Sequence, residues 1–530
     1  MFSHNLIVRF ILLTETVMKG LIFMRVALHR VESDCLKLIY DNEISKEETL
    51  ELVVPDVCAD IGKILDVRGQ FLLSSTKAKT DEVHVSASVE VTVIYAADES
   101  GKVQHVSAII PFDQTIPVEG ADENAKIILK CRLCTIDART LNPRKLLLRA
   151  DVSMHLCAYY PDNFALWDNL SDNPSAPVHI LQKEIEHCLV MGIREKSFTI
   201  SDEYRVSEDK GQNLKMLSAS TEICVQDAKA VGNKLVLKAE ANTTAVFLNE
   251  NDDSLFSCVF SSQFSQIIEV DTYGESIEDT VIIQLKDAEF TCIPNKENGY
   301  AVSAQLHMTA QAVCRERKNS VYIADAYSNE YKMVAEAVDT KIAKCPILKN
   351  LKLSMRGKLQ QKTTLDEIMY IAAAAVCAEA DGNEIVCRAD ISGVGKSESG
   401  DLESIALELK AEENIELAKS QKLNIVSICC GQPAVIGPMQ NAEVGIEINI
   451  EYAIVEFSEI NAVAGIELDE ESNARSENCP SLVVLCSERG TDLWSLAKKY
   501  GSTVELITNS NTIDGEFSTN RRPLLIPKSK

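Results

Sequence analysis

The stretch that decides the fold is residues 83–93, which read Val-His-Val-Ser-Ala-Ser-Val-Glu-Val-Thr-Val. Every second residue is apolar and either β-branched or small, so an extended chain has one apolar and one polar face. This alternation is typical of a β-strand that is buried on one face only. The same pattern recurs between residues 50 and 460, for example in segments 145–154, 234–247, 280–285, 300–308 and 444–455.

Turn-forming sequences separate these segments. Residues 98–101 read Asp-Glu-Ser-Gly, and residues 381–383 read Asp-Gly-Asn. A parallel sheet would require an amphipathic helix between successive strands, and we find no such helix of adequate length. We therefore predict a mainly β protein built from antiparallel β-rich domains.

The chain also repeats itself. Residues 63–133, shifted by 152 positions, superpose on residues 215–285 without a gap, and Tyr95 then meets Phe247. A weaker third copy begins near residue 345. Because each copy is long enough to bury its own core, we predict tandem β-rich repeat domains rather than a solenoid.

Polar, Pro-containing joints divide the chain. The predicted parts are an N-terminal arm at 1–29, β domains at 30–160, 175–330 and 345–467, a linker at 468–480 and a C-terminal module at 481–530. The apolar runs of the N-terminal arm are too short to span a membrane and contain charges. We expect no signal peptide and no membrane insertion, and whether residues 1–23 are translated stays open because Met24 is an alternative start.

The composition excludes several classes of protein. With 53 Lys and Arg against 79 Asp and Glu, the net charge is −26, which argues against a nucleic-acid binder and against attachment to an anionic membrane. The apolar content of 46% is ordinary for a globular protein. Seventeen scattered cysteines indicate free thiols in a reducing compartment, so we expect a cytoplasmic protein.

No motif points to catalysis. Residues 393–397 end like a phosphate-binding loop, but Asp390 stands where that motif requires glycine, and we predict a Gly/Ser hairpin instead. Cys131 and Cys134 have redox or metal-ligand spacing, yet residues three apart in a strand point to opposite faces. We find no nucleophile elbow, zinc-protease helix or paired carboxylates, and predict a protein that is not an enzyme and carries no metal or cofactor.

The pattern changes in the last fifty residues. A short apolar strand at 482–486 is followed by apolar residues at helical spacing between 493 and 500. Residues 502–505 read Ser-Thr-Val-Glu, a capping box that opens a second helix. A second apolar strand at 524–527 completes the order strand, helix, helix, strand.

This C-terminal module resembles the LysM family. Residues 490–501 read Gly-Thr-Asp-Leu-Trp-Ser-Leu-Ala-Lys-Lys-Tyr-Gly, and Asn-Ser-Asn at 509–511 and Leu-Ile-Pro at 525–527 complete the match. The resemblance implies a small βααβ domain whose groove binds N-acetylglucosamine-containing chains or a protein partner. The groove positions and added basic contacts that we predict are Thr491, Asp492, Leu493, Trp494, Asn509, Asn511, Ile513, Arg521 and Arg522.

Two departures from the LysM pattern concern binding. Thr491-Asp492 reverses the usual Asp-Thr order, and Arg521-Arg522-Pro523 replaces the usual Pro-Gly-Gln. From Pro480 onward there are 7 Lys and Arg against 5 Asp and Glu, a net charge of +2, which leaves −28 on the remainder. A basic module on an acidic chain fits recognition of an acidic protein surface as readily as recognition of a sugar.

The first domain carries a second resemblance. Residues 54–65 read Val-Pro-Asp-Val-Cys-Ala-Asp-Ile-Gly-Lys-Ile-Leu, and together with the strand that ends at Tyr95 and with Pro111-Phe112 they resemble the SPOCS domain of sporulating Firmicutes. The resemblance extends more weakly over 175–315 and 345–465. SPOCS-like repeats followed by LysM are similar to clostridial spore-coat morphogenetic proteins.

The two resemblances together imply a function. The expected protein is a non-enzymatic scaffold or adaptor in spore coat assembly, located in the mother-cell cytoplasm at the forespore surface. Its implied partners are the coat-basement ATPase SpoIVA, docked through LysM, and other spore coat proteins. The alternative is a LysM-mediated binder of peptidoglycan or N-acetylglucosamine in the cell wall or spore cortex.

Overall fold

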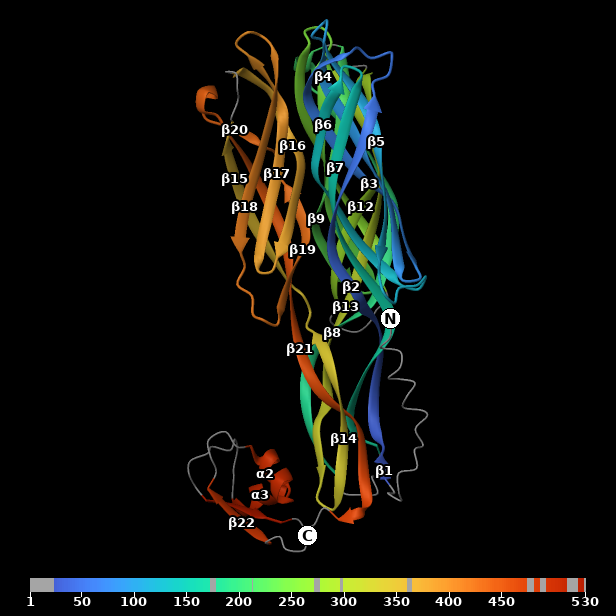
Figure 1. The fold of residues 1–530 in the computed structure, drawn as a ribbon, viewed down its shortest axis with the longest axis vertical. Helices are drawn as coiled ribbons and strands as arrows, with labels where there is room; N and C mark the ends of the chain where they lie inside the picture. Colours follow the sequence, from blue (N-terminus) through green and yellow to red (C-terminus); the bar gives the residue numbers. More distant parts are fainter. Residues whose placement is uncertain are drawn as a thin grey trace.

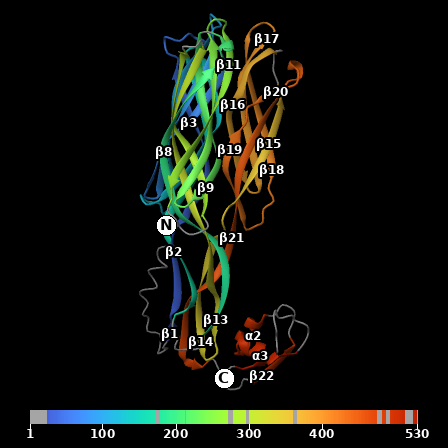
Figure 2. The same ribbon diagram turned by 180° about the vertical axis from the view of Figure 1, so that it is seen from behind.

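The computed structural model describes residues 23–171, 178–211, 213–270, 277–295, 299–359, 365–473, 481–486, 492–511 and 523–528. The molecule is elongated, with a wide head above a narrow stalk and a small C-terminal unit beside the lower end of the stalk (Figure 1). The stalk comprises residues 23–38, 159–170, 178–190, 315–343 and 457–473, and the head comprises the other described residues up to 456. Seen from behind, the same three parts are distinct (Figure 2).

The head begins with a sandwich of two antiparallel sheets. Its strands are β2 (Leu28–Val53), β3 (Ile61–Lys79), β4 (Glu82–Ala97), β5 (Val103–Pro117), β6 (Lys126–Asn142) and β7 (Lys145–Leu170). The sheet β3-β4-β5 packs on β2-β7-β6. Val83, Val85 and Val89 of β4 lie in the core between the sheets, so the predicted alternation is confirmed.

Two further sandwiches have the same arrangement. The second contains β8 (Val178–Val206), β9 (Leu214–Val231), β10 (Lys234–Asn249), β11 (Ser254–Glu269), β12 (Ile277–Asn295) and β13 (Gly299–Ser328), with a short helix η1 (Glu208–Lys210). The third contains β15 (Ile347–Lys358), β16 (Leu365–Asp381), β17 (Glu384–Ser397), β18 (Leu402–Asn414), β19 (Gln421–Cys430), β20 (Ala434–Ile436) and β21 (Glu443–Asn473), with η2 (Met439–Asn441). The strand pairing is antiparallel throughout, which confirms the mainly β prediction.

The three sandwiches contact one another in a ring. Strand β6 of the first packs on β16 of the third, β12 of the second on β3 of the first, and β19 of the third on β9 of the second. An apolar cluster at their meeting point contains Leu65, Ile94 and Val103 from the first sandwich, Leu217, Val246 and Leu255 from the second, and Tyr370 and Val394 from the third. The first two triplets stand 152 residues apart in the sequence. The tandem-repeat interpretation itself stays a prediction.

A buried polar network also joins the first and third sandwiches. The Arg68 Nε donates to Asp66 Oδ2 over 2.7 Å, and the Tyr370 hydroxyl donates to the same oxygen over 2.8 Å. Two further Arg68 nitrogens donate to the carbonyl oxygens of Ala373 and Ser392. Because Arg68 and Asp66 are almost completely buried, each needs the other as its counter-charge.

The stalk is made of the ends of long strands, with β1 (Phe23–Val26) and β14 (Tyr331–Ala343) added. The joints predicted at 161–174 and 331–344 contain strand, since residues 161–170 continue β7 and residues 331–343 form β14. Strand β14 is exposed over most of its length, although the stalk also buries Leu166, Ile323 and Leu468 in apolar clusters of its own. The polar residues of these two segments therefore belong to partly exposed stalk strands and do not form a linker.

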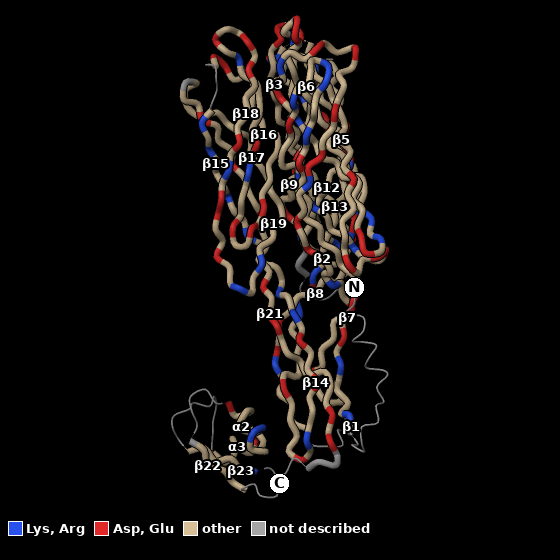
Figure 3. Tube along the Cα trace, viewed as in Figure 1, with Lys and Arg blue, Asp and Glu red and all other residues tan. Residues whose placement is uncertain are grey.

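The ends of the predicted domains differ as well. The predicted linker at 468–480 begins inside β21, where Leu468 is completely buried between Met24 and Met333 on the two neighbouring strands. Residues 23–26 of the predicted N-terminal arm form β1, while residues 1–22 lie outside the described residues. Figure 3 shows Asp and Glu spread over both head and stalk, as the net charge of the chain requires.

The C-terminal unit has the predicted order of elements, β22 (Leu482–Cys486), α2 (Leu493–Tyr500), α3 (Val504–Asn511) and β23 (Pro523–Pro527). Strands β22 and β23 pair antiparallel, and Leu496, Ala497 and Ile507 fill the core beneath them. The assignment of this unit to LysM stays a prediction. No helix among the described residues has the length and apolar character needed to cross a membrane.

The cap of helix α3 differs from the prediction by one residue. The Thr503 Oγ1 accepts from the Leu506 N–H over 3.1 Å, so Thr503 and not Ser502 caps the helix. Ser502 is instead buried, and its hydroxyl donates to the Pro527 carbonyl oxygen of β23. The capping box pattern pairs Ser502 with Glu505, but the Ser502 hydroxyl is bonded to β23, which leaves the cap to Thr503.

Candidate functional site

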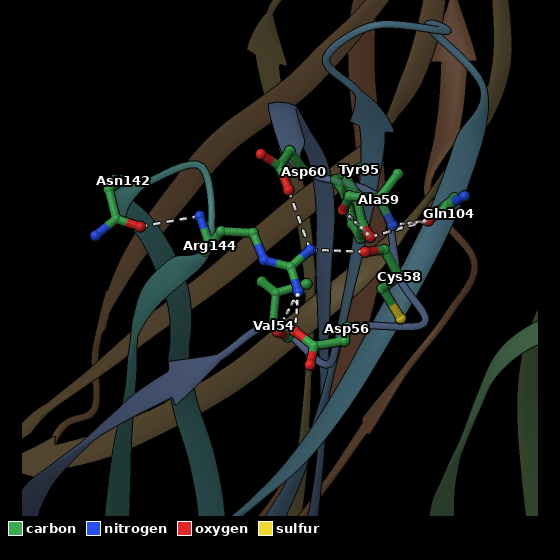
Figure 4. A network of polar contacts seen from close by, with 9 residues as sticks. All are labelled: Val54, Asp56, Cys58, Ala59, Asp60, Tyr95, Gln104, Asn142 and Arg144. Carbon is green, nitrogen blue, oxygen red and sulfur yellow. Dashed lines mark hydrogen bonds and ion pairs between the residues drawn. The ribbon is translucent and has the colours of Figure 1, made fainter.

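The sequence motif at residues 54–60 forms the loop between β2 and β3, and Arg144 holds it in place (Figure 4). One terminal nitrogen of Arg144 donates to the Cys58 carbonyl over 2.7 Å and to the Asp60 carboxylate over 3.0 Å. The other donates to the Val54 carbonyl over 2.9 Å and to the Asp56 carboxylate over 3.1 Å. One guanidinium therefore fixes four points of the loop, which its planar fork of donors allows.

Tyr95 supports the same loop from the core side. Its hydroxyl donates to the Ala59 carbonyl over 3.0 Å, and the Ala59 N–H donates to the Gln104 Oε1 over 3.0 Å. Burial raises the pKa of Tyr95 to about 12, so it stays a neutral donor. Clamped from both sides, the loop presents Val57 to solvent with 94% of the residue exposed. A single exposed valine is ordinary on a protein surface, so the clamped loop is defined here by its hydrogen bonds and not by a binding patch.

Helix α2 contains three of the residues predicted to form the groove. Asp492 is its N-cap and accepts from the Ser495 N–H over 2.7 Å, and these hydrogen bonds hold the pKa of Asp492 below its ordinary value. Leu493 is half-buried against the core of the unit. Trp494 is half-buried as well, and its ring packs against Tyr327 of the stalk. Asp492 and Leu493 therefore stabilise the unit itself.

The predicted asparagines have different environments. Asn511 joins α3 to β23, because its amide donates to the Leu525 carbonyl over 2.6 Å and accepts from the Leu525 N–H over 2.7 Å. Asn509 is exposed and available to a partner. Thr491, Ile513, Arg521 and Arg522 lie outside the described residues.

The C-terminal unit rests on the stalk through β13. The Trp494 Nε1 donates to Asp325 Oδ2 over 2.8 Å, and the Lys498 ammonium group lies 2.7 Å from Asp325 Oδ1. Burial alone would raise the pKa of Asp325, but the hydrogen bonds from Lys498 and Trp494 outweigh it and hold the pKa below its ordinary value. The Tyr327 ring packs edge-on against the Trp494 ring, with 4.8 Å between the two ring centroids.

A second set of contacts completes this junction. The Tyr327 hydroxyl and the Asn329 amide both donate to the Ser502 carbonyl, over 3.0 and 3.1 Å. Sequence reasoning missed the stalk side of this junction, since no local pattern links Asp325 to a helix 169 positions further along the chain. The outer face of the β22-β23 pair points away from the core of the unit and exposes Leu482, Val484 and Leu525.

Among the described residues, two groups of side chains in the head could hold a metal ion, and one of them contains Asp41, His155 and Cys157. Asp41 Oδ1 lies 2.7 Å from His155 Nε2 and 3.4 Å from Cys157 Sγ. The Lys422 ammonium group is bonded to the same carboxylate, and Lys130 is buried nearby with its pKa lowered to about 8 by that burial. Burial, followed by the Asp41 charge, raises the pKa of Cys157 to about 12, so its sulfur is a neutral thiol. The positive charges of Lys422 and Lys130 therefore already balance the Asp41 carboxylate, as a bound cation would.

The fold and the clamped loop define a class of protein: three β-sandwiches in one chain, followed by a small C-terminal unit that contains two strands and two helices. Within this chain, residues 60–141 match the family model described as "SipL, SPOCS domain". The matched region starts at the clamped loop and covers β3 to β6, and it confirms the predicted SPOCS resemblance of the first domain. The chain has no match among curated proteins or among solved structures.

Proposed function

We propose that this protein is a non-enzymatic scaffold and adaptor in spore coat assembly, with a role like that of SipL. The single observation that carries the proposal is the match of residues 60–141 to the SipL SPOCS domain, a domain of sporulation proteins. The elongated head and stalk support a scaffold, since they offer long β-surfaces at a distance from the C-terminal unit. The location that follows is the mother-cell side of the forespore surface.

The C-terminal unit is the proposed adaptor, and the coat-basement ATPase SpoIVA is its proposed partner. Because α2 faces the stalk, the exposed side of the unit is the outer face of β22 and β23, with Val484 59% exposed at its centre. The basic pair Arg521-Arg522 immediately precedes β23 in the sequence. An apolar face, with a basic pair adjacent to it in the sequence, fits a partner surface of apolar and acidic side chains.

The test measures binding of the full-length protein to purified SpoIVA by biolayer interferometry. Val484→Glu and the double variant Arg521→Glu/Arg522→Glu are each expected to weaken binding at least tenfold. Val259→Glu is the matched control for the first, because Val259 is an exposed strand valine in the head. Lys77→Glu/Lys79→Glu is the charge-matched control for the second. Wild-type affinity in both test variants would contradict docking through this unit.

The LysM resemblance favours a second candidate function, binding of peptidoglycan through N-acetylglucosamine. In this case Asn509, exposed at the end of α3, is a predicted groove residue that contacts the sugar. The same full-length protein is mixed with sedimented peptidoglycan and centrifuged. Saturable pelleting that Asn509→Ala abolishes, with no binding to SpoIVA, would replace the adaptor proposal by the glycan-binding one.

A further inference from the structure

The contact between the first and third sandwiches brings together two cysteines from distant parts of the chain. Cys134 stands at a bulge of β6, between Leu133 and Thr135, and Cys377 lies on β16. Their sulfur atoms and a carboxylate oxygen of Glu379 all lie within 4.8 Å of one another. Both cysteines are buried, with 8% and 3% of their surfaces exposed.

We propose that Cys134 and Cys377 are a redox-reactive pair that forms a disulfide between the first and third sandwiches when the protein meets a hydroperoxide. Cys131, which shares the CxxC spacing with Cys134, has no part in this pair because it packs against the core of the first sandwich. The reactive partner therefore comes from the tertiary structure and not from the local motif.

The environment of Cys377 makes it the attacking sulfur. A hydrogen bond with Cys134 holds the pKa of Cys377 below its ordinary value, while the same contact and burial raise the pKa of Cys134. Among the neighbouring charges, the Glu379 carboxylate raises the Cys377 pKa, and Arg388, directly opposite Cys377 in the β16–β17 ladder, lowers it by less. The hydrogen bond with Cys134 is therefore what favours the Cys377 thiolate. Thiolates, and not thiols, react with peroxides.

The chemistry proceeds in two balanced steps. The Cys377 thiolate attacks one oxygen of hydrogen peroxide, the O–O bond breaks, and sulfenic acid and hydroxide form. The Cys134 thiol then attacks the sulfenic sulfur, the S–S bond forms, and the oxygen leaves as water. The two sulfurs together lose two electrons, and the peroxide is reduced to water and hydroxide.

A metal ion is the competing occupant of this site, because Cys134, Cys377 and Glu379 are three potential ligands. A disulfide uses the two sulfurs alone and needs no further ligand, and the experiment below separates it from a bound metal ion.

The experiment treats the reduced full-length protein with equimolar hydrogen peroxide, alkylates the remaining thiols and digests with trypsin. The expected product joins peptide 133–139 to peptide 363–388, with Cys134 bonded to Cys377 in the fragment spectrum. Dithiothreitol is expected to release the two peptides. Because peptide 363–388 also contains Cys387, the digest is repeated with Cys387→Ser, in which the same linkage should form.

Matched variants decide the outcome. Cys134→Ala and Cys377→Ala should each abolish the linked peptide, whereas Cys131→Ala should retain it, with circular dichroism verifying that each variant is folded. The proposal is overturned if Cys377 accumulates as sulfinic acid while Cys134 stays reduced. It is equally overturned if stoichiometric zinc remains bound to the pair and blocks the linkage.

Discussion

Arg144 is the side chain on which the loop at residues 54–60 depends, because its guanidinium reaches two carbonyl oxygens and two carboxylates. Replacement by Met leaves the two carbonyls and the loop carboxylates without that donor. We expect Arg144→Met to lower the free energy of unfolding by about 2 kcal/mol, measured by urea denaturation. Arg139→Met is the control, because Arg139 is largely exposed in a surface ion pair with Asp137 and should cost less than about 0.5 kcal/mol.

The consequence for the loop can be measured separately. Hydrogen exchange at the backbone amides of residues 54–62 should accelerate in Arg144→Met, whereas exchange in the third sandwich should not change. Unchanged exchange in this loop would show that Tyr95 and Gln104 hold it without Arg144.

Asp390 is a partly buried carboxylate that stands directly opposite Glu408 in the β17–β18 ladder. Burial, followed by the Glu408 charge, raises the pKa of Asp390 to about 6 from 3.8. The native state therefore binds this proton more tightly than the unfolded chain, so Asp390 lowers the free energy of unfolding as pH rises from about 4 to about 6.

The matching variant is Asp390→Asn, which removes the charge. At pH 7.5 we expect it to stabilise the protein by about 1 kcal/mol, a value reduced for solvent screening because Asp390 is partly exposed. Below pH 4 the variant and the wild type should have the same urea midpoint. The control is Asp366→Asn on the exposed part of β16, and an equal gain there would assign the effect to net charge instead.

At the scale of elements, one face of helix α2 packs on the core of the C-terminal unit and another contacts the stalk. Asp492 caps its start and Gly501, in a left-handed conformation with φ 65°, ends it. Leu496 and Ala497 face the core of the unit, whereas Trp494 and Lys498 reach Asp325 on the stalk. The helix thus both folds the unit and attaches it.

Asp325→Ala should release this attachment. The variant removes the acceptor of both Trp494 and Lys498 and is expected to weaken the contact by about 2 kcal/mol. In a Trp167→Phe background Trp494 is the sole tryptophan, so its fluorescence should shift to longer wavelength and become more accessible to iodide. Asp339→Ala on β14 of the stalk is the control. Identical quenching in both variants would mean that Asp325 does not hold the unit.

Some strands and helix caps were predictable from the sequence, and others were not. The strands of the head were predictable because one face of each is buried, as the alternation of β4 shows. The caps of α2 were predictable because Asp492 and Gly501 act on residues within one turn. The stalk strands were not, because polar residues interrupt their apolar runs and β14 is exposed over most of its length.

At the scale of the whole molecule, Arg68 and Asp66 form the buried link between the first and third sandwiches. Arg68→Met leaves the Asp66 carboxylate buried without its counter-charge, and we expect a loss of about 3 to 5 kcal/mol in unfolding free energy. The double variant Asp66→Asn/Arg68→Met should recover at least half of that loss, since no unpaired charge remains. Urea denaturation measures both variants.

Hydrogen exchange tests whether Arg68→Met loosens the third sandwich as well as the first. Because Arg68 donates to carbonyl oxygens of β16 and β17, hydrogen exchange should accelerate in the third sandwich as well as in the first. Leu148→Ala, a cavity variant inside the first sandwich, should accelerate exchange mainly there. If the two variants produce the same exchange pattern, the network does not couple the sandwiches.

The sequence by itself determined the strand-rich class, the order of elements in the C-terminal unit, the SPOCS resemblance of the first domain and the acidic character of the chain. Each of these depends on neighbouring residues or on composition, because side-chain periodicity and capping act over a few positions. For the candidate site, the sequence assigned Asp492, Leu493 and Asn511 to a groove, and the structure adds their contacts within the unit while the groove itself stays a prediction.

Only the tertiary structure decided the rest: the ring of three sandwiches, the Arg144 clamp, the attachment of Trp494 to Asp325 and the proximity of Cys134 to Cys377. The physical reason is that these contacts join residues far apart in the chain, whose meeting depends on how whole sheets pack. A sequence pattern records which face of a strand is apolar, and it does not record which other surface covers that face.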